Sequence, residues 1–135
     1  MRLCMLLALA PVLLLLSCSR ERLMEKVFVV QIKAGEDKLK EYLEYHRAVW
    51  PEVEQGFEKA GYRQIRLLRS QHTVVMIIKV PEGADLEAMG KEAEAYNPRC
   101  AEWNRLMSGY QEGVPGTAPG QTWTVAEPFY LFGRE

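Results

Sequence analysis

The sequence has little of what most metal sites and nucleic-acid surfaces are made from. Its 135 residues contain two histidines and three cysteines, too few for a site of His and Cys ligands, and no carboxylate spacing replaces one. Seventeen basic and eighteen acidic residues give a formal net charge of -1, and no Lys/Arg cluster could neutralise a row of phosphates. We therefore expect no metal and no nucleic-acid partner.

Long apolar runs are also missing, except at the N-terminus. The apolar stretch over 3–16 follows Arg2 and is shorter than the roughly 20 residues that span a bilayer. Ser17 and Cys18 close it, as in a signal peptide with the lipobox of bacterial lipoproteins. We expect 1–17 to be removed and Cys18 to become the lipidated N-terminus of an exported protein, which contacts the membrane through this lipid only. A soluble secreted product is the alternative.

The remaining chain has room for one domain. We assign 18–26 to a linker and 27–132 to the domain, whose length is typical of a single hydrophobic core. Cys4 would leave with the signal peptide and Cys18 would carry lipid, so Cys100 has no partner for a disulfide. We interpret Cys100 as a small buried apolar residue.

Hydrophobic periodicity and turn residues predict alternating strands and pairs of helices. The expected strands are 27–32, 62–69, 73–80 and 125–132, and the expected helices are 36–46, 51–60, 86–96 and 98–107. Gly and Pro make 109–120 an irregular loop. The order β-αα-β-β-αα-β is the split βαβ arrangement of ferredoxin-like α+β folds, with helices on one face of a four-stranded antiparallel sheet.

The other face of this sheet would have no cover within one chain. It would expose some of Val27, Val29, Val75 and Ile77. A second copy of the chain can cover these side chains, so we expect a homodimer, unless the loop over 109–120 folds across that face.

The clearest functional signal lies where the first helix ends. Residues 46–52, His-Arg-Ala-Val-Trp-Pro-Glu, resemble the His-x-x-x-Trp-Pro-Glu segment of L-rhamnose mutarotases. Tyr42 stands four residues earlier, and Trp103, Met107 and the closing segment 127–131 resemble further features of that family, in the same order. The ordered set is more specific than any one of its motifs.

The resemblance implies an aldose 1-epimerase with a dimeric α/β-barrel fold. Such an enzyme interconverts the α and β anomers of L-rhamnose or a related 6-deoxy sugar, without metal or organic cofactor. Ring opening removes a proton from the C1 hydroxyl and delivers one to the ring oxygen, and an imidazole with a near-neutral pKa suits both transfers. The resemblance assigns the acid/base role to His46 and monosaccharide binding to Tyr42 and Trp103.

Each of these residues also has a structural interpretation. A histidine at a helix end often hydrogen-bonds a backbone carbonyl, and this would be our reading of His46 without the neighbouring motif. Trp103 could serve the core equally well. His72 lies in a predicted hairpin turn and is expected to be solvated.

Two substrate-binding positions depart from the family pattern. Asn104 stands where the family commonly has a second tryptophan, and Ile65 stands where it has a tyrosine on the second strand. These changes leave the acid/base in place, so the reaction class is better supported than the sugar. The alternatives are a non-catalytic, lipid-anchored sugar-binding module and a monooxygenase-like dimeric α/β-barrel protein.

Overall fold

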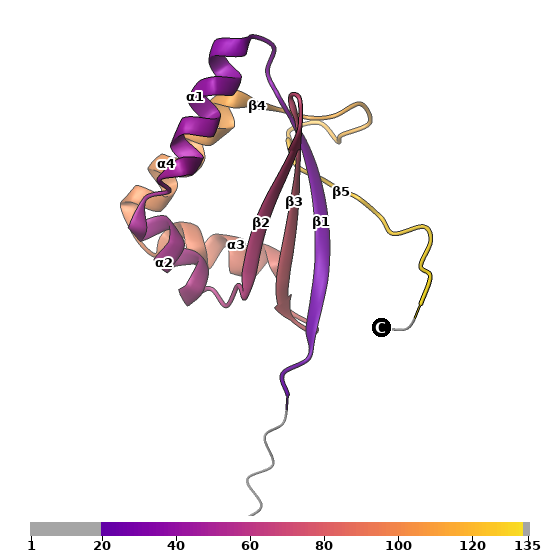
Figure 1. Cartoon of the computed structure of the whole chain (residues 1–135). Coiled ribbons are helices and arrows are strands. Elements are labelled where there is room, and N and C mark those ends of the chain that lie inside the picture. The colour runs from indigo at the N-terminus through magenta and orange to yellow at the C-terminus, as the bar shows by residue number, and fades with distance from the viewer. Residues whose placement is uncertain (1–19, 134–135) are drawn as a thin grey trace, which may run out of the picture.

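Four helices cover one face of an antiparallel sheet in the computed structural model, which describes residues 20–133 (Figure 1). The strands are β1 (Leu23–Ile32), β2 (Gln64–Ser70), β3 (Thr73–Pro81), β4 (Gln111–Glu112) and β5 (Thr124–Val125). The helices are α1 (Glu36–Arg47), α2 (Pro51–Lys59), α3 (Leu86–Ala95) and α4 (Pro98–Tyr110). The predicted ferredoxin-like order is therefore confirmed, whereas the predicted signal peptide and Cys18 lie outside the described residues.

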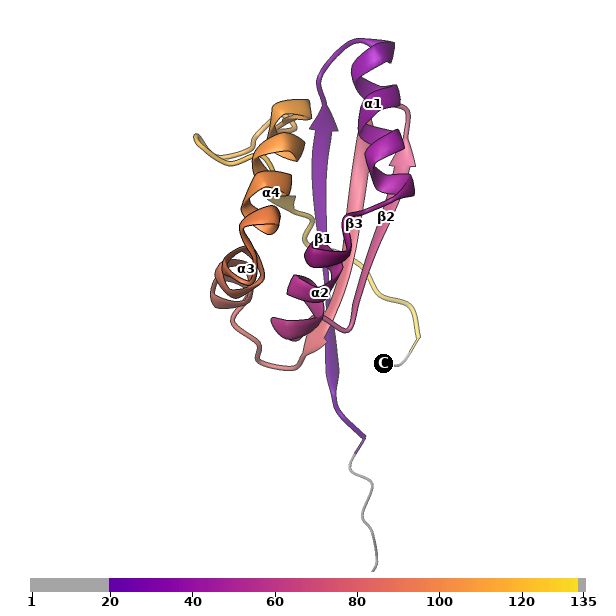
Figure 2. The ribbon, with the colours of Figure 1, turned by 90° about the vertical axis from the view of Figure 1, so that its left-hand side faces the viewer.

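The sheet has the order β2-β3-β1-β4, and β5 also pairs with β1. Val27 lies opposite Ile77 and Val29 opposite Val75 in the β1–β3 ladder. Side chains alternate between the two faces of a strand, so the neighbouring Val30 and Val74 face the helices, where both are buried. Figure 2 shows all four helices in front of the same face of the sheet. No helix within 20–133 is long and apolar enough to cross a membrane.

The prediction of a last strand over 125–132 is wrong. Two residues, Thr124 and Val125, pair with β1, and the Ala126 backbone N–H still donates to Val27 O at 2.8 Å. Pro128 follows, which lacks an N–H for the ladder, and the chain then leaves the sheet edge. Gln111 and Glu112, which we placed in the irregular loop, form β4 instead, so the sheet has five strands and not four.

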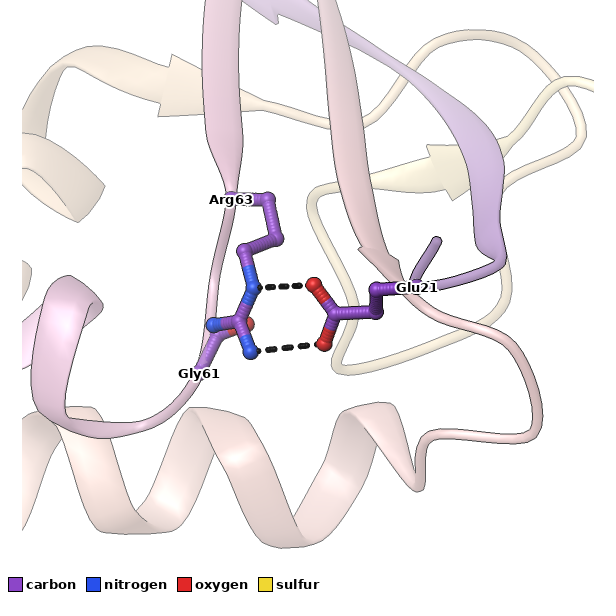
Figure 3. Close-up of polar contacts among 3 residues, drawn as sticks. All are labelled: Glu21, Gly61 and Arg63. Atoms are coloured by element: carbon purple, nitrogen blue, oxygen red, sulfur yellow. Dashed lines mark hydrogen bonds and ion pairs between the residues drawn. The ribbon is translucent and has the colours of Figure 1, made fainter. Parts of the chain in front are cut away.

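The first strand begins earlier than predicted. β1 starts at Leu23, inside the segment that we assigned to a linker, 18–26. Just before it, Glu21 is held by Arg63: Nε donates to Glu21 Oε2 at 2.9 Å and Nη2 donates to Oε1 at 2.8 Å (Figure 3). The Arg63 Nη1 atom also donates to the carbonyl oxygen of Gly61, at 3.0 Å. This two-bond pair ties the start of β1 to the start of β2.

Helix starts follow from local chemistry. Pro51 and Pro98 each occupy the first turn of a helix, where the missing N–H would have no intrahelical partner. The Asp85 side chain accepts from the backbone N–H groups of the first turn of α3, and Asn97 does the same for α4. Pro51 also forces a break after α1, so that α1 and α2 are separate helices.

Two core clusters hold the helices on the sheet. One cluster joins α1 and α4 to the sheet through buried Ile32, Tyr42 and Trp103. The other joins α2 and α3 to the sheet through buried residues such as Ile78 and Met89. Residues of both clusters, among them Tyr42 and Ile78, also line a cavity.

Candidate active site

A cavity of about 1200 Å³ lies between the helices and the sheet. Apolar side chains from β1, β2 and β3 form one wall, among them Phe28, Leu67 and Met76. Helices α1 and α4 supply the opposite wall, and Trp123 contributes from the segment before β5. A smaller hollow beside α1, about 630 Å³, is lined mostly by charged residues and excludes His46. The larger cavity is lined by His46 of the motif and by Tyr42 and Trp103.

Tyr42 and His46 project from α1 into this cavity. They are one helical turn apart, so their side chains lie on the same face, and their ring centroids are 4.3 Å apart. Tyr42 is only 2% exposed, whereas His46 is half-buried at the end of the helix. A phenol and an imidazole can therefore contact the same small ligand.

The hydrogen bond of His46 defines which ring nitrogen is free. Nδ1 lies 2.8 Å from the carbonyl oxygen of Tyr42, and a carbonyl can only accept, so Nδ1 carries the proton. In the neutral ring Nε2 then keeps its lone pair. Burial lowers the pKa of His46, and the bond to Tyr42 O opposes this shift in part. The neutral ring at physiological pH therefore offers Nε2 as an acceptor.

Trp103 lies beside His46 from the opposite helix. The two ring centroids are 5.4 Å apart with an edge-on geometry, and Trp103 is buried and lines the cavity. Trp50 packs edge-on against it at 5.3 Å, and the Arg99 guanidinium lies 3.6 Å from the Trp50 ring centroid. Trp103 is thus both a core residue and a wall of the cavity, and Trp50 joins the helices.

The two positions that depart from the family pattern also line the cavity. Ile65 adds a half-buried apolar side chain from β2. Asn104 lies at an exposed edge, where its Nδ2 donates to Glu94 Oε2 at 2.7 Å. The sequence-predicted site residues are therefore brought together around one space, with an apolar side at Ile65 and a polar side at Asn104.

Sequence reasoning missed a buried polar residue of the cavity. Gln111 on β4 is buried, lines the cavity, and donates from Nε2 to Tyr42 Oη at 3.5 Å. Nothing in the local sequence marks it, because it follows α4 in a stretch that reads as an irregular loop. Burial raises the pKa of Tyr42 and the bond from Gln111 opposes this shift, so the phenol is protonated at neutral pH.

The other two candidate residues, Cys100 and His72, lie outside the cavity lining. Cys100 is buried with a free thiol, as expected, and its Sγ donates to Glu52 O at 3.3 Å. The prediction that His72 is solvated is wrong: the residue is half-buried, and its Nε2 is shielded from solvent without a hydrogen-bond partner among the described residues. No cluster of three or more His, Cys, Asp or Glu side chains that could hold a metal ion occurs within 20–133.

The sequence profile of the L-rhamnose mutarotase family matches residues 25–132, which include the whole cavity lining. The chain belongs to the L-rhamnose mutarotase family. The enzymes of this family are sugar isomerases, so the chain is assigned to the isomerases that act on carbohydrates.

Individual relatives agree with this family. An L-fucose mutarotase from Xanthomonas campestris pv. campestris is 33% identical over 102 residues, which span 73% of this chain and 80% of that protein. A UPF0734 protein from Dictyostelium discoideum is 22% identical over 95 residues, or 68% of this chain and 76% of that one.

Solved structures show the same fold. An L-rhamnose mutarotase from Formosa agariphila superposes with a TM-score of 0.56 at 18% identity, over 82% of this chain and 99% of that one. A dimeric ferredoxin-like protein from an uncultured marine organism gives 0.50 at 9% identity, over 84% of this chain and 95% of that one. These likenesses support the ferredoxin-like fold of the L-rhamnose mutarotase family.

Proposed function

We propose that the protein interconverts the α and β anomers of L-rhamnose or a related 6-deoxy sugar, with His46 as the principal proton-transfer residue. The observation that carries this proposal is the hydrogen bond from His46 Nδ1 to Tyr42 O. It leaves Nε2 of His46, a residue that lines the cavity, as a hydrogen-bond acceptor. A base is what the first step of ring opening requires, because the C1 hydroxyl must lose its proton.

The reaction needs two proton transfers and no net change in protons. Nε2 of His46 takes the proton from the C1 hydroxyl, a carbonyl forms at C1, and the bond between C1 and the ring oxygen breaks. The ring oxygen gains a proton from the imidazolium or from a neighbouring hydroxyl donor such as Tyr42. Rotation about the C1–C2 bond and reversal of these steps close the ring as the other anomer.

The cavity supports a 6-deoxy sugar as the substrate class. Ile65, Phe28 and Met76 make one wall apolar, and such a wall suits the methyl group that replaces a hydroxymethyl group in L-rhamnose and L-fucose. Trp103 offers an aromatic surface to the ring carbons. Asn104 and Gln111 supply amide groups for sugar hydroxyls.

Exchange NMR on a panel of reducing sugars tests the proposal. The protein should raise the rate of α–β exchange of L-rhamnose or L-fucose above the spontaneous rate, and saturation transfer should show bound sugar. Saturation without faster exchange would indicate the non-catalytic sugar-binding alternative. Neither signal with any sugar of the panel would overturn the proposal.

We propose further that Cys18 anchors the protein to a membrane that faces away from the cytoplasm. The support is the apolar run over 3–16 and the Ser17-Cys18 pair that closes it. Metabolic labelling with a fatty-acid analogue should label the full chain and not the Cys18→Ala variant. Label that persists in this variant would exclude the site.

A further inference from the structure

Gln111 is the single buried polar or charged residue within 20–133, and it lines the cavity. It is 8% exposed. Burial of an amide costs free energy unless its donor and acceptor groups find partners, and an apolar side chain would pack there without this cost. The amide therefore needs an explanation that core packing does not give.

The backbone holds Gln111 firmly in this place. Gln111 pairs with Ile32 in the β1–β4 ladder, and its N–H donates to Ser108 O at the end of α4. The neighbouring Lys33 N–H donates to Tyr110 O at 2.9 Å. The short strand β4 thus sets the position of the Gln111 amide relative to Tyr42 on α1.

The contact between the two side chains has a direction. Gln111 Nε2 donates to Tyr42 Oη at 3.5 Å, so the phenol oxygen is the acceptor. The Tyr42 O–H is then free to donate elsewhere, and no other side chain among the described residues accepts from it. Within the same residues, no donor contacts Gln111 Oε1. One hydroxyl donor and one amide acceptor are therefore left to a ligand.

We propose that Gln111 is a substrate-positioning residue, which fixes the Tyr42 hydroxyl as a donor to the sugar ring oxygen and itself accepts from an adjacent sugar hydroxyl. This inference rests on the proposed sugar binding in the cavity. A ring oxygen of a sugar can only accept, so a phenol whose oxygen is already engaged by Gln111 is the matching partner. His46 Nε2 is the complementary acceptor for the C1 hydroxyl.

Two variants of Gln111 test the direction of this hydrogen bond. Gln111→Met keeps the volume and removes both polar groups, so we expect saturation-transfer affinity and exchange efficiency for L-rhamnose or L-fucose to fall about tenfold. Gln111→Glu keeps the shape but replaces the donor with an acceptor, which would draw the Tyr42 hydroxyl away from the ring oxygen. We expect its exchange rate at saturating sugar to fall further than that of Gln111→Met.

A matched control and a double variant separate positioning from support of the fold. Gln64→Met changes an exposed glutamine on β2 that does not line the cavity, and it should behave as wild type. Once Tyr42→Phe has removed the hydroxyl, Gln111→Met should cost less than it does in the wild-type protein, because the two residues act together. A merely structural role of Gln111 would cost the same in both backgrounds.

The outcomes of this experiment are distinct. Folded Gln111→Met that binds and exchanges sugar at the wild-type level would overturn the positioning role and leave the proposed function intact. Wild-type protein that binds sugar without exchange would overturn the proposed catalysis, while a loss of affinity in Gln111→Met would still support the positioning role. Wild-type protein that binds no sugar of the panel would overturn both.

Discussion

The surroundings of His46 fit two interpretations that are usually considered alternatives, a structural role and the proton-transfer role that we propose. Its Nδ1 atom donates to a backbone carbonyl one turn back, as a structural histidine at a helix end would. The same bond leaves the lone pair on Nε2, and the break before Pro51 keeps the ring from being enclosed by another helical turn. The structural hydrogen bond is thus compatible with the proton transfer that we propose, because it leaves Nε2 as an acceptor.

We predict that His46→Ala folds normally and loses most anomer exchange. A positioned acid or base contributes about 10²- to 10⁴-fold to a rate, so exchange should fall by about this factor. Exchange NMR measures the rate, and circular dichroism checks the fold. The matched control is His72→Ala, since His72 lies in the β2–β3 turn and does not line the cavity. Wild-type exchange in His46→Ala would refute the assignment.

We also predict the position of the acid limb in the pH profile. His46 must be neutral to act as a base, and burial lowers its pKa, so the neutral form persists to lower pH than in an exposed histidine. The efficiency of exchange should therefore be constant near pH 7 and fall only below about 6.5, the ordinary pKa of histidine. The measurement is kcat/KM against pH, corrected for spontaneous mutarotation. A fall of kcat/KM centred above the ordinary pKa of histidine would contradict a buried, neutral His46 ring.

At the level of helices and strands, the sequence predicts those elements whose position depends on local residue patterns. The β-branched run at 73–80 and the prolines at 51 and 98 correctly predict β3 and the starts of α2 and α4. The spacing of Tyr42 and His46 on one helix face predicts half of the site without any tertiary information.

The features that the sequence does not predict depend on contacts with residues that are distant along the chain. The apolar segment 125–132 looks like a strand, yet of its residues only Val125 pairs with β1 in the ladder, and Pro128 lacks the N–H that continued pairing requires. Gln111 reaches Tyr42 only because β4 pairs with the end of β1. Trp103 was assigned to the site through a family resemblance, because helix periodicity alone does not distinguish a core tryptophan from a cavity wall.

Close packing among α2, α3 and α4 depends on a glycine. A Cβ atom added at Gly56 on α2 would lie 2.8 Å from Ala93 O and 3.2 Å from Cys100 Sγ. The first of these is a backbone atom, which cannot move without shifting α3.

We predict that Gly56→Ala destabilises the protein by about 1–3 kcal/mol, the usual cost of overpacking. Gly90→Ala is the matched control, because Gly90 lies within α3 and a Cβ atom there meets nothing within 4 Å. This control should instead gain about 0.5–1 kcal/mol from the higher helix propensity of alanine. Urea unfolding of the two variants and wild type gives both free energies. Equal stability of all three proteins would contradict the close contact.

The whole molecule presents apolar surface on the side without helices. Val27, Val29, Val75 and Ile77 lie on this face of β1 and β3, each of them only half-buried. The chain after β5 runs along the same side, away from the helices (Figures 1 and 2). Its side chains are strongly exposed: Phe129 100%, Tyr130 75%, Leu131 64% and Phe132 89%. Such an apolar arm buries little surface within a single chain and so contributes little to its stability.

We predict that the protein is a homodimer in which this arm and this sheet face are buried against a second copy. A fully buried phenylalanine contributes about 1.5–3 kcal/mol, so burying Phe129 and Phe132 from both copies would favour association substantially. Light scattering at micromolar concentration should give twice the mass of one chain. The double variant Phe129→Ser with Phe132→Ser should shift this mass toward one chain, because it removes both phenylalanines of the apolar arm without touching a core residue.

The control for this variant is Tyr96→Ser, which removes an aromatic side chain that is also exposed, 41%, but lies at the end of α3 on the helix side of the sheet. It should leave the dimer mass unchanged, since the proposed interface does not include that side. Wild-type protein with the mass of a single chain would contradict the dimer. A stable dimer of the Phe129/Phe132 double variant would instead show that the sheet face associates without the arm.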